Sequence, residues 1–203
     1  MTGGPRPSWA ALAPEGTDGP AAVAARLGAY CWVEQQLFGL LGTWVVEIAE
    51  PDVKVLVAEH AEHAAWRALR WFELLPSAPP GADAIVAAPA GTLATWARVE
   101  SLAAGPEATA TKVCLAHQVL MPALLVAYTA HGDWASPVTE AAATRVLAMA
   151  SHDLASDVAD GQRLLAALQV APSTYAAARA EVEEALAGVG GLVGAGSAGA
   201  RPV

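Results

Sequence analysis

The chain has 203 residues, of which 55% are hydrophobic and 15% charged, and its formal net charge is −9 at pH 7. This length and composition suit one folded domain and exclude a chain that is disordered throughout. The net negative charge and the lack of clustered cations argue against nucleic-acid and membrane partners. The two cysteines are too few for a disulfide scaffold. We therefore expect a cytoplasmic protein.

Both ends of the chain are predicted to lie outside the folded domain. Residues 1–18 are rich in glycine and proline and predict a flexible N-terminal arm, and the Gly/Ala-rich residues 188–203 predict a disordered tail. Between them, residues 19–187 predict one helical bundle domain, because apolar residues recur at helical spacing and strand-like alternation is nearly absent.

Prolines and glycines set the predicted helix boundaries. Pro51 suits the first position of a helix, and Ser136 before Pro137 is typical of an N-cap that opens another. The stretch 113–132 has no charged residue and is long enough to span a membrane, but the polar residues and the proline within it favour a core helix. The expected helices cover about residues 20–49, 51–75, 88–104, 108–130, 137–170 and 172–187.

The first helix carries the clearest functional signal, a carboxylate on its apolar face. An α-helix turns about 100° per residue, and this rotation places Glu34 at the centre of a stripe that includes Leu27, Leu37 and Leu41. Burying a carboxylate is costly unless it is protonated, hydrogen-bonded, ion-paired or bound to a metal. We therefore expect Glu34 to have polar partners on neighbouring helices.

Histidines fall on or beside the apolar faces of two other helices. His117 lies at the centre of one face, close to Pro122, which is expected to kink the helix and to free a backbone acceptor. On the second helix His60 and Arg67 flank the apolar face, and His60 and His63 at i and i+3 could hold one metal ion. The alternatives are a structural core histidine at position 117 and a solvated face with surface ion pairs on the second helix.

An acidic edge follows the core side of the helix predicted at 137–170. Asp157 flanks the apolar stripe and Asp153 lies one step further out, whereas His152 points away from the core. This edge supplies candidate metal ligands, and the alternative is a solvated acidic border.

Four long helices, an inward glutamate in the first and a Glu/His cluster in the second resemble the ferritin-like superfamily of carboxylate-bridged di-iron proteins. In that family two helices each give a Glu and two others each give Glu-x-x-His. The resemblance covers about residues 20–170 and implies an all-α, ferritin-like four-helix bundle with additional short helices, which would bind iron or manganese. The metal ligands that it implies, in degenerate form, are Glu34, His60, His63, His117, Asp153 and Asp157.

The ligand set departs from that family in ways that change its chemistry. His60 stands where the second-helix motif has a glutamate, and His117 falls near the position of the third glutamate. Bridging carboxylates balance the charge of two irons, so replacing two of them by neutral imidazoles favours one divalent ion or no metal. Without metal, an internal network would satisfy each of its members, namely Glu34, His60, Arg67, His117 and Asp157.

Two functions follow from these alternatives. The first is a binding or assembly module with a metal-free polar site, which would contact a protein partner or a second copy of the chain. The second is a ferritin-like, metal-dependent oxidoreductase that activates oxygen on iron or manganese. A small apolar ligand is also compatible with the composition. The expected contact surface of the assembly module consists of Trp32, Trp44, Trp66 and Trp71.

Overall fold

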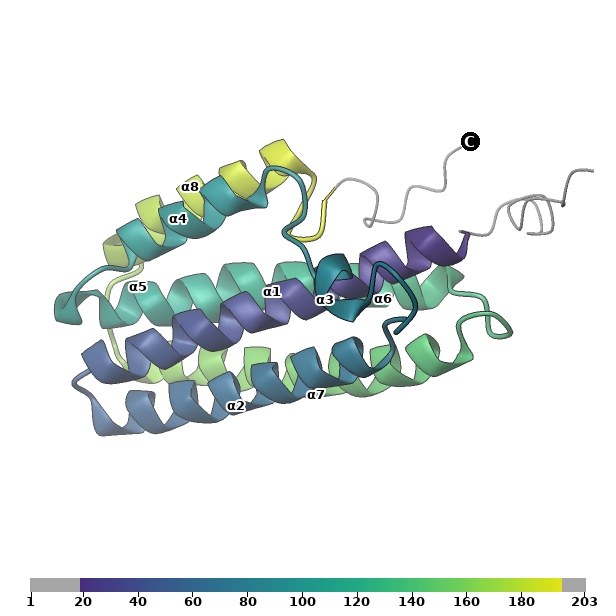
Figure 1. Ribbon diagram of the computed structural model, residues 1–203. Coiled ribbons are helices and arrows are strands. Elements are labelled where there is room, and N and C mark those ends of the chain that lie inside the picture. Colours follow the sequence, from purple (N-terminus) through teal and green to yellow (C-terminus); the bar gives the residue numbers. More distant parts are fainter. Residues whose placement is uncertain (1–18, 195–203) are drawn as a thin grey trace, which may run out of the picture.

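The computed structural model describes residues 19–194, and all regular secondary structure in that range is helical. The all-α prediction is therefore confirmed. Four long helical segments lie side by side as a bundle (Figure 1). They are α1 (Pro20–Glu47), α2 (Pro51–Glu73), the run of α5 (Thr109–Cys114), η3 (Leu115–Leu120) and α6 (Met121–Trp134), and α7 (Ala141–Ala167).

Two further helices form a layer on one side of the bundle. Helices α4 (Thr92–Leu102) and α8 (Ser173–Val189) lie against each other, and α8 also packs on α5 (Figure 1). The short α3 (Ala82–Ile85) crosses α1 at Gly28, where an added Cβ would lie 2.3 Å from the carbonyl oxygen of Ile85. A glycine at position 28 therefore allows this close approach.

The first two helices form an antiparallel hairpin whose connection the sequence predicted well. A proline occupies the start of each helix, where its missing N–H costs nothing and its fixed φ suits the helix. Only residues 48–50 separate the two helices. The hairpin positions the inward faces of α1 and α2 opposite each other along most of their length.

The predicted start of α7 at Pro137 is wrong, because the helix begins at Ala141. The buried Glu140 explains the difference: its Oε1 accepts a hydrogen bond from the backbone N–H of Ser136 at 3.2 Å, and its Oε2 lies 2.9 Å from His131 Nε2. These bonds hold residues 135–140 as a turn. The preceding helix α6 accordingly runs past the expected end at 130, since His131 is buried within it.

At the C-terminal side the chain stays packed beyond the boundary expected at residue 188. Helix α8 ends at Val189 with Gly190 in the left-handed conformation at φ 78°, and Leu192 and Val193 beyond it are buried. The rest of the predicted tail, residues 195–203, and the predicted N-terminal arm, residues 1–18, lie outside the described residues.

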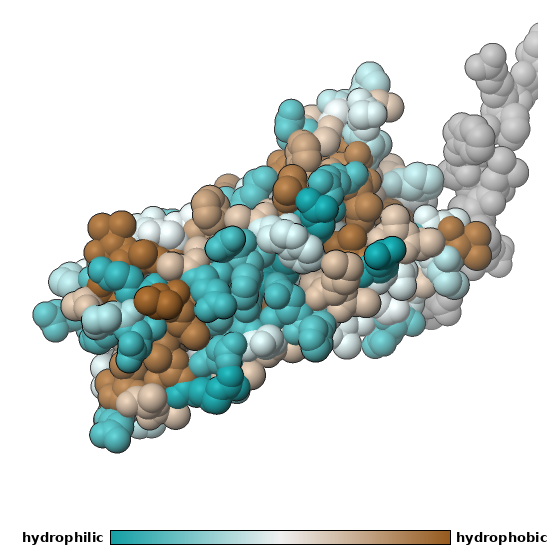
Figure 2. Space-filling model, turned by 90° about the horizontal axis from the view of Figure 1, so that it is seen from below, coloured by the Kyte–Doolittle hydropathy of each residue, from teal (hydrophilic) through white to brown (hydrophobic). Residues whose placement is uncertain are grey.

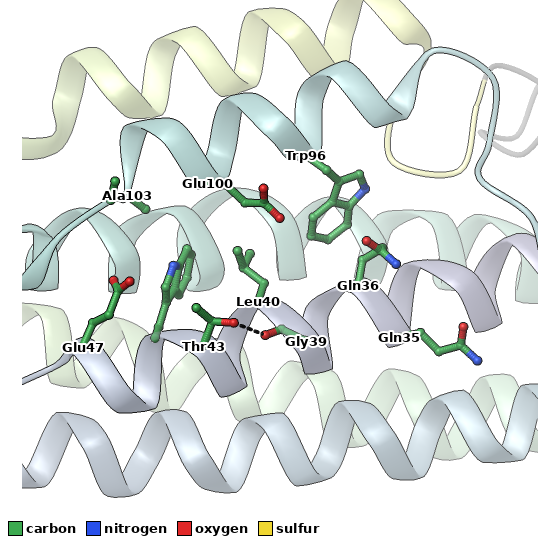
Figure 3. Close-up of a pocket in the computed structure, with 11 residues that line it drawn as sticks. Gln35, Gln36, Gly39, Leu40, Thr43, Glu47, Trp96, Glu100 and Ala103 are labelled. Carbon is green, nitrogen blue, oxygen red and sulfur yellow. Dashed lines mark hydrogen bonds between the residues drawn. The ribbon is translucent and has the colours of Figure 1, made fainter.

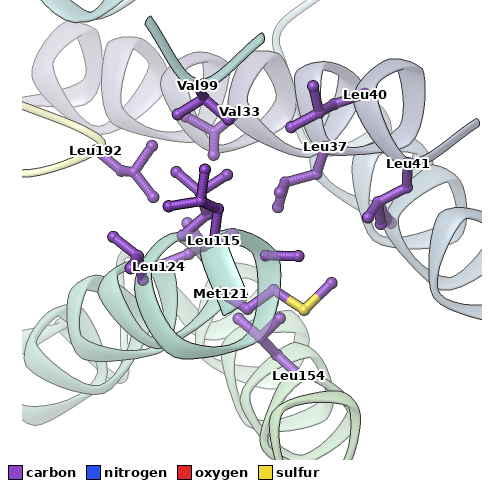
Figure 4. Packing of buried hydrophobic residues seen from close by; sticks show 14 of the residues in the cluster. Val33, Leu37, Leu40, Leu41, Val99, Leu115, Met121, Leu124, Leu154 and Leu192 are labelled. Atoms are coloured by element: carbon purple, nitrogen blue, oxygen red, sulfur yellow. The ribbon is translucent and has the colours of Figure 1, made fainter. Parts of the chain in front are cut away.

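The hydrophobic core lies where α1, α2, the α5–η3–α6 segment and α7 face one another. Figure 4 shows Leu37 and Leu41 of α1 directed toward Leu115 and Met121, with Leu154 of α7 below them. All five are buried. The polar site described below is built into the same interior.

The tryptophans expected to form a contact surface are mostly used for packing. Trp71 is fully buried and Trp44 is nearly so, whereas Trp66 is 38% exposed. Trp32 packs edge to face on Trp96 of α4, with ring centroids 6.0 Å apart. The prediction of a tryptophan contact surface is therefore wrong for Trp44 and Trp71.

One helical stretch, Pro106–Trp134, is long and apolar enough to cross a membrane by length and composition. Within its most apolar window, 61% of the residues are buried against the rest of the structure. This burial is typical of a core helix.

Candidate functional site

Buried polar side chains from α1, α2 and α7 meet around one arginine, Arg67 of α2. Its Nε donates to Oε1 of Glu34 on α1 at 2.7 Å. Its Nη1 donates to Oδ2 of Asp157 at 2.8 Å and to Oδ2 of Asp153 at 2.5 Å, both on α7. Arg67, Glu34 and Asp157 are enclosed, and Asp153 is the member closest to solvent. One guanidinium therefore joins three carboxylates from two helices.

The helical repeat of α2 places its site residues on one face. His60, Ala64, Arg67 and Trp71 follow one another at three- or four-residue steps, and all four are buried. The small side chain of Ala64 leaves room between the histidine and the arginine. His60 and Arg67, which the sequence placed beside the apolar face of this helix, are therefore enclosed.

Three carboxylates surround one guanidinium, and this excess of negative charge affects the pKa values of the buried residues in the group. Burial by itself lowers the pKa of Arg67, but the charges of Glu34 and Asp157 raise it overall, so the guanidinium stays charged. Burial raises the pKa of Glu34 and of Asp157, and Arg67 acts against both rises. Burial would lower the pKa of His63, but its hydrogen bond to Asp157 raises that pKa overall. The group thus favours an additional positive charge next to Asp157.

Two aromatic residues complete the surroundings of Glu34, and the sequence analysis did not identify them. Trp71 Nε1 donates to the hydroxyl of Tyr128 at 2.8 Å, and that hydroxyl donates to Glu34 Oε1 at 2.8 Å. The available signal was a tyrosine on an apolar stripe of α6, because a buried tyrosine hydroxyl usually needs a polar partner. Oε2 of Glu34 has no hydrogen-bond partner among the residues that the structure describes.

A chain of histidines lies on the other side of Asp157. His117 Nδ1 is 3.0 Å from the carbonyl oxygen of Val113, and His117 Nε2 is 2.8 Å from His60 Nδ1. Burial lowers the pKa of His117 to about 4 and that of His60 to about 3, so both rings are neutral at pH 7. His117 thus makes the bond to a backbone carbonyl that is expected of a core histidine.

For two neutral rings, the hydrogen bonds decide which nitrogens carry protons. A carbonyl only accepts, so His117 Nδ1 donates to Val113, and the neutral ring must then accept at Nε2. His60 Nδ1 is the donor to that nitrogen. His60 Nε2 is left with a lone pair, and it lies 3.5 Å from Asp157 Oδ1.

A widened helical turn carries His117. Residues 115–120 form a π-helix, and the N–H of Met121 bonds to the carbonyl oxygen of Ala116, five residues earlier. The sequence predicts a disturbance of this helix at Pro122, because proline cannot donate to the carbonyl of Gln118. The disturbance takes the form of the π-turn, a feature that is frequent at functional sites.

The structure brings the six predicted ligands into two adjoining sets. Glu34, Asp153 and Asp157 surround Arg67, whereas His60, His63 and Asp157 form a group in which one ligand atom from each lies within 4.8 Å of the others. Asp157 belongs to both sets. His117 contributes to the second set only through His60.

These residues do not fit a di-metal centre. Two metal ions would need the bridging carboxylates that Arg67 already binds, and a guanidinium offers donors only and no ligand atom. The Arg67 guanidinium instead places a single positive charge among these carboxylates. The chemistry that remains open to the site is a buried ion-pair network with a separate His/His/Asp group beside it.

Glu34→Gln is expected to change the free energy of unfolding by less than about 1 kcal/mol, because a glutamine oxygen can still accept from Arg67 and Tyr128. Glu34→Ala should cost about 2–4 kcal/mol, since two buried donors lose their acceptor. Urea denaturation of both variants measures the difference. Equal losses in the two variants would contradict the proposed role of Glu34 as an acceptor.

Comparisons of this chain with protein-family models, with curated proteins and with solved structures found no match. The structure itself establishes an all-helical protein that contains a buried His/His/Asp group.

Proposed function

We propose that this protein is a ferritin-like four-helix bundle in which an arginine takes the place of the di-metal centre, and that it acts as a binding or assembly module. The observation that carries the proposal is the Arg67 guanidinium bonded to Glu34, Asp153 and Asp157. A buried network of this kind links α1, α2 and α7 without metal. The polar interior then serves the scaffold, and partners are contacted at the surface.

An apolar surface on the hairpin supports the assembly role. Two shallow grooves, of about 570 and 360 Å³, adjoin at Phe38, which lines both. Phe38 and Leu69 are each 49% exposed, although large apolar side chains are usually buried. We define the α1–α2 surface as Phe38, Gly42 and Val46 of α1 with Ala65, Leu69 and Phe72 of α2.

The apolar character continues toward one end of the molecule. Figure 2 shows hydrophobic residues gathered at the end where α2 begins, and hydrophilic residues across the middle of the same face. Val46 and Val55, near the α1–α2 connection, are 83% and 67% exposed. A second copy of the chain that packs its own hairpin on this surface would cover these side chains.

Two glycines on α1 add to this support. Gly39 and Gly42 lie within a helix, where each glycine costs about 0.8–1.0 kcal/mol relative to alanine. A Cβ added at either position would meet nothing within 4 Å, so packing within the chain does not require them. The two glycines would allow a partner helix to approach α1 closely.

A hollow between α1 and α4 is a less favourable binding site for a small apolar ligand. Its volume is about 510 Å³ (Figure 3). Trp96 and Leu40 line it together with Gln36, Glu47 and Glu100. The two carboxylates give it an acidic, partly polar wall, which does not suit a purely apolar molecule.

Sedimentation velocity of the purified chain tests the assembly role, with a dimer as the expected result. Phe38→Glu and Leu69→Glu should each shift the protein to a monomer, because a charge would be buried at the centre of the interface. Val126→Glu, at a valine of α6 that is 64% exposed and lies outside the α1–α2 surface, is the matched control and should leave the dimer intact. A wild-type protein that sediments as a monomer at all concentrations would contradict self-assembly.

The second candidate function is a metal-dependent oxidoreductase that uses iron or manganese. The observation that favours it is the grouping of His60, His63 and Asp157, since two histidines and one carboxylate are the ligand set of many oxygen-activating iron enzymes. Oxygen consumption by the iron-loaded protein with a reductant would support this function. A rate equal to that of free iron would exclude it.

A further inference from the structure

We propose that the protein binds a single divalent metal ion between α2 and α7, held by His60, His63 and Asp157. The proposal is independent of the assembly role, because it concerns the interior beside Arg67 and none of the residues of the α1–α2 surface. It also differs from a di-metal centre, since Glu34 and Arg67 take no part in holding the ion. The ligand atoms of the three residues already lie within 4.8 Å of one another.

The first argument is the orientation of His60. Its Nδ1–H donates to His117, so the lone pair of Nε2 faces Asp157 Oδ1 at 3.5 Å. Both atoms are electron-rich, and both side chains are at least 98% enclosed, with exposed fractions of 2% and 1%. A positive charge between these two atoms would be stabilised by both. A metal ion supplies that charge and accepts both lone pairs.

The second argument is distance. Ligand bonds of about 2.0–2.1 Å to a tetrahedral ion place neighbouring ligand atoms about 3.3 Å apart. The separation of 3.5 Å between His60 Nε2 and Asp157 Oδ1 agrees with this value within about 0.2 Å. His63 Nδ1 now donates to Asp157 Oδ1 at 2.8 Å, and an ion would replace that hydrogen bond with one ring nitrogen of His63 as the third ligand.

The third argument is the support behind the ligands. A metal-binding histidine usually donates its other ring N–H to an acceptor that fixes its orientation. His60 does so to His117, and His117 in turn donates to the carbonyl oxygen of Val113. The second oxygen of Asp157, Oδ2, is held by Arg67 at 2.8 Å. Two of the three ligands are therefore already oriented before an ion binds.

The site also has a route to solvent and a chemical preference. The side chain of His63 is 34% exposed, and that of the neighbouring Asp153 is 31% exposed, so an ion can enter between α2 and α7. Two imidazoles and one carboxylate suit zinc, cobalt, iron(II) or manganese(II). Magnesium and calcium prefer ligand sets made of oxygen alone.

The test uses chelator-treated, tag-free full-length protein titrated with cobalt(II) and followed by visible absorption, with zinc(II) by calorimetry. We expect one ion per chain and at least a tenfold preference over magnesium. His63→Ala, at a half-exposed position that leaves Arg67 and its partners intact, should weaken binding at least tenfold, as should His60→Ala. His152→Ala, which removes the exposed histidine of α7, is the matched control and should bind like wild type.

His117 is a positioning residue in this proposal, and its variants separate positioning from packing. His117→Ala should weaken binding by about 10–100-fold with one ion per chain retained, because His60 loses the acceptor that orients it. His117→Gln should recover much of the affinity, since its side-chain oxygen can accept from His60 Nδ1. Far-UV circular dichroism of each variant confirms that the helices are formed.

Several results would overturn the proposal. They are the lack of saturable binding of both cobalt(II) and zinc(II), a stoichiometry of two, or wild-type affinity in both His63→Ala and His60→Ala. Should His60→Ala fail to fold, His63→Ala decides the question alone. None of these results bears on the sedimentation experiment, so a failed metal site and a failed assembly role are distinguishable.

Discussion

Arg67→Met is expected to lower the free energy of unfolding by about 3–5 kcal/mol, because it leaves buried carboxylates without their cation. Glu34 and Asp157 have almost no solvent access, so water cannot replace the guanidinium. Methionine keeps a similar length and apolar volume, which limits any cavity. Urea denaturation monitored by circular dichroism measures the change. For a chain of this size, each kcal/mol should also lower the melting temperature by about 2–4 °C.

Arg70→Met provides the matched control on the same helix. Arg70 is partly exposed and pairs with Glu73 at 2.9 Å, three residues further along α2. An exposed pair of this kind contributes about 0.2–1 kcal/mol, so its loss should be small. If Arg67→Met and Arg70→Met destabilised the protein equally, Arg67 would not be the cation that balances the buried carboxylates.

Gly161→Ala is the second substitution for which we expect a large effect. Its Cβ would lie 2.0 Å from Cγ of the His117 ring and 2.5 Å from the histidine Cβ, far closer than atoms can pack. The ring cannot swing aside without losing its bonds to Val113 and His60. Overpacking of this kind typically costs about 1–3 kcal/mol, which chemical denaturation would detect.

Gly132→Ala is expected to raise the free energy of unfolding, whereas Gly161→Ala lowers it. A Cβ at this position of α6 would meet nothing within 4 Å. Replacing such a helical glycine by alanine should stabilise the protein by about 0.4–1 kcal/mol, because the unfolded chain loses conformational freedom. A stabilising Gly161→Ala would show that α7 does not lie against His117 as described.

The sequence was most informative where a charged residue lay on the apolar face of its helix. Glu34 on an apolar stripe predicted a buried carboxylate with partners on other helices, and Arg67 of α2 and Tyr128 of α6 are those partners. Pro51 likewise predicted the boundary between α1 and α2, because its effect is local. Such inferences need only the helical period and the chemistry of one residue.

The sequence was less informative where contacts between distant helices decide the outcome. A metal-free network was one of the alternatives that the sequence left open. The bonds from Arg67 to Asp153 and Asp157 could not be predicted, because they depend on how α2 and α7 are rotated about their axes. Tyr128 lies on an apolar stripe, where helical periodicity does not distinguish a tyrosine from an apolar residue. The partner of its hydroxyl could therefore not be predicted from the pattern. The start of α7 was misplaced because the bonds of Glu140 to His131 and Ser136 outweigh a favourable cap and proline.

The most direct measurement is anomalous diffraction from crystals of this protein soaked in manganese(II). The account predicts electron density for the Arg67 guanidinium between Glu34 and Asp157, and an anomalous peak beside His60 and His63 alone. A peak bound by both Glu34 and Asp153, with the Arg67 side chain displaced, would contradict the claim that an arginine stands in place of the metal pair.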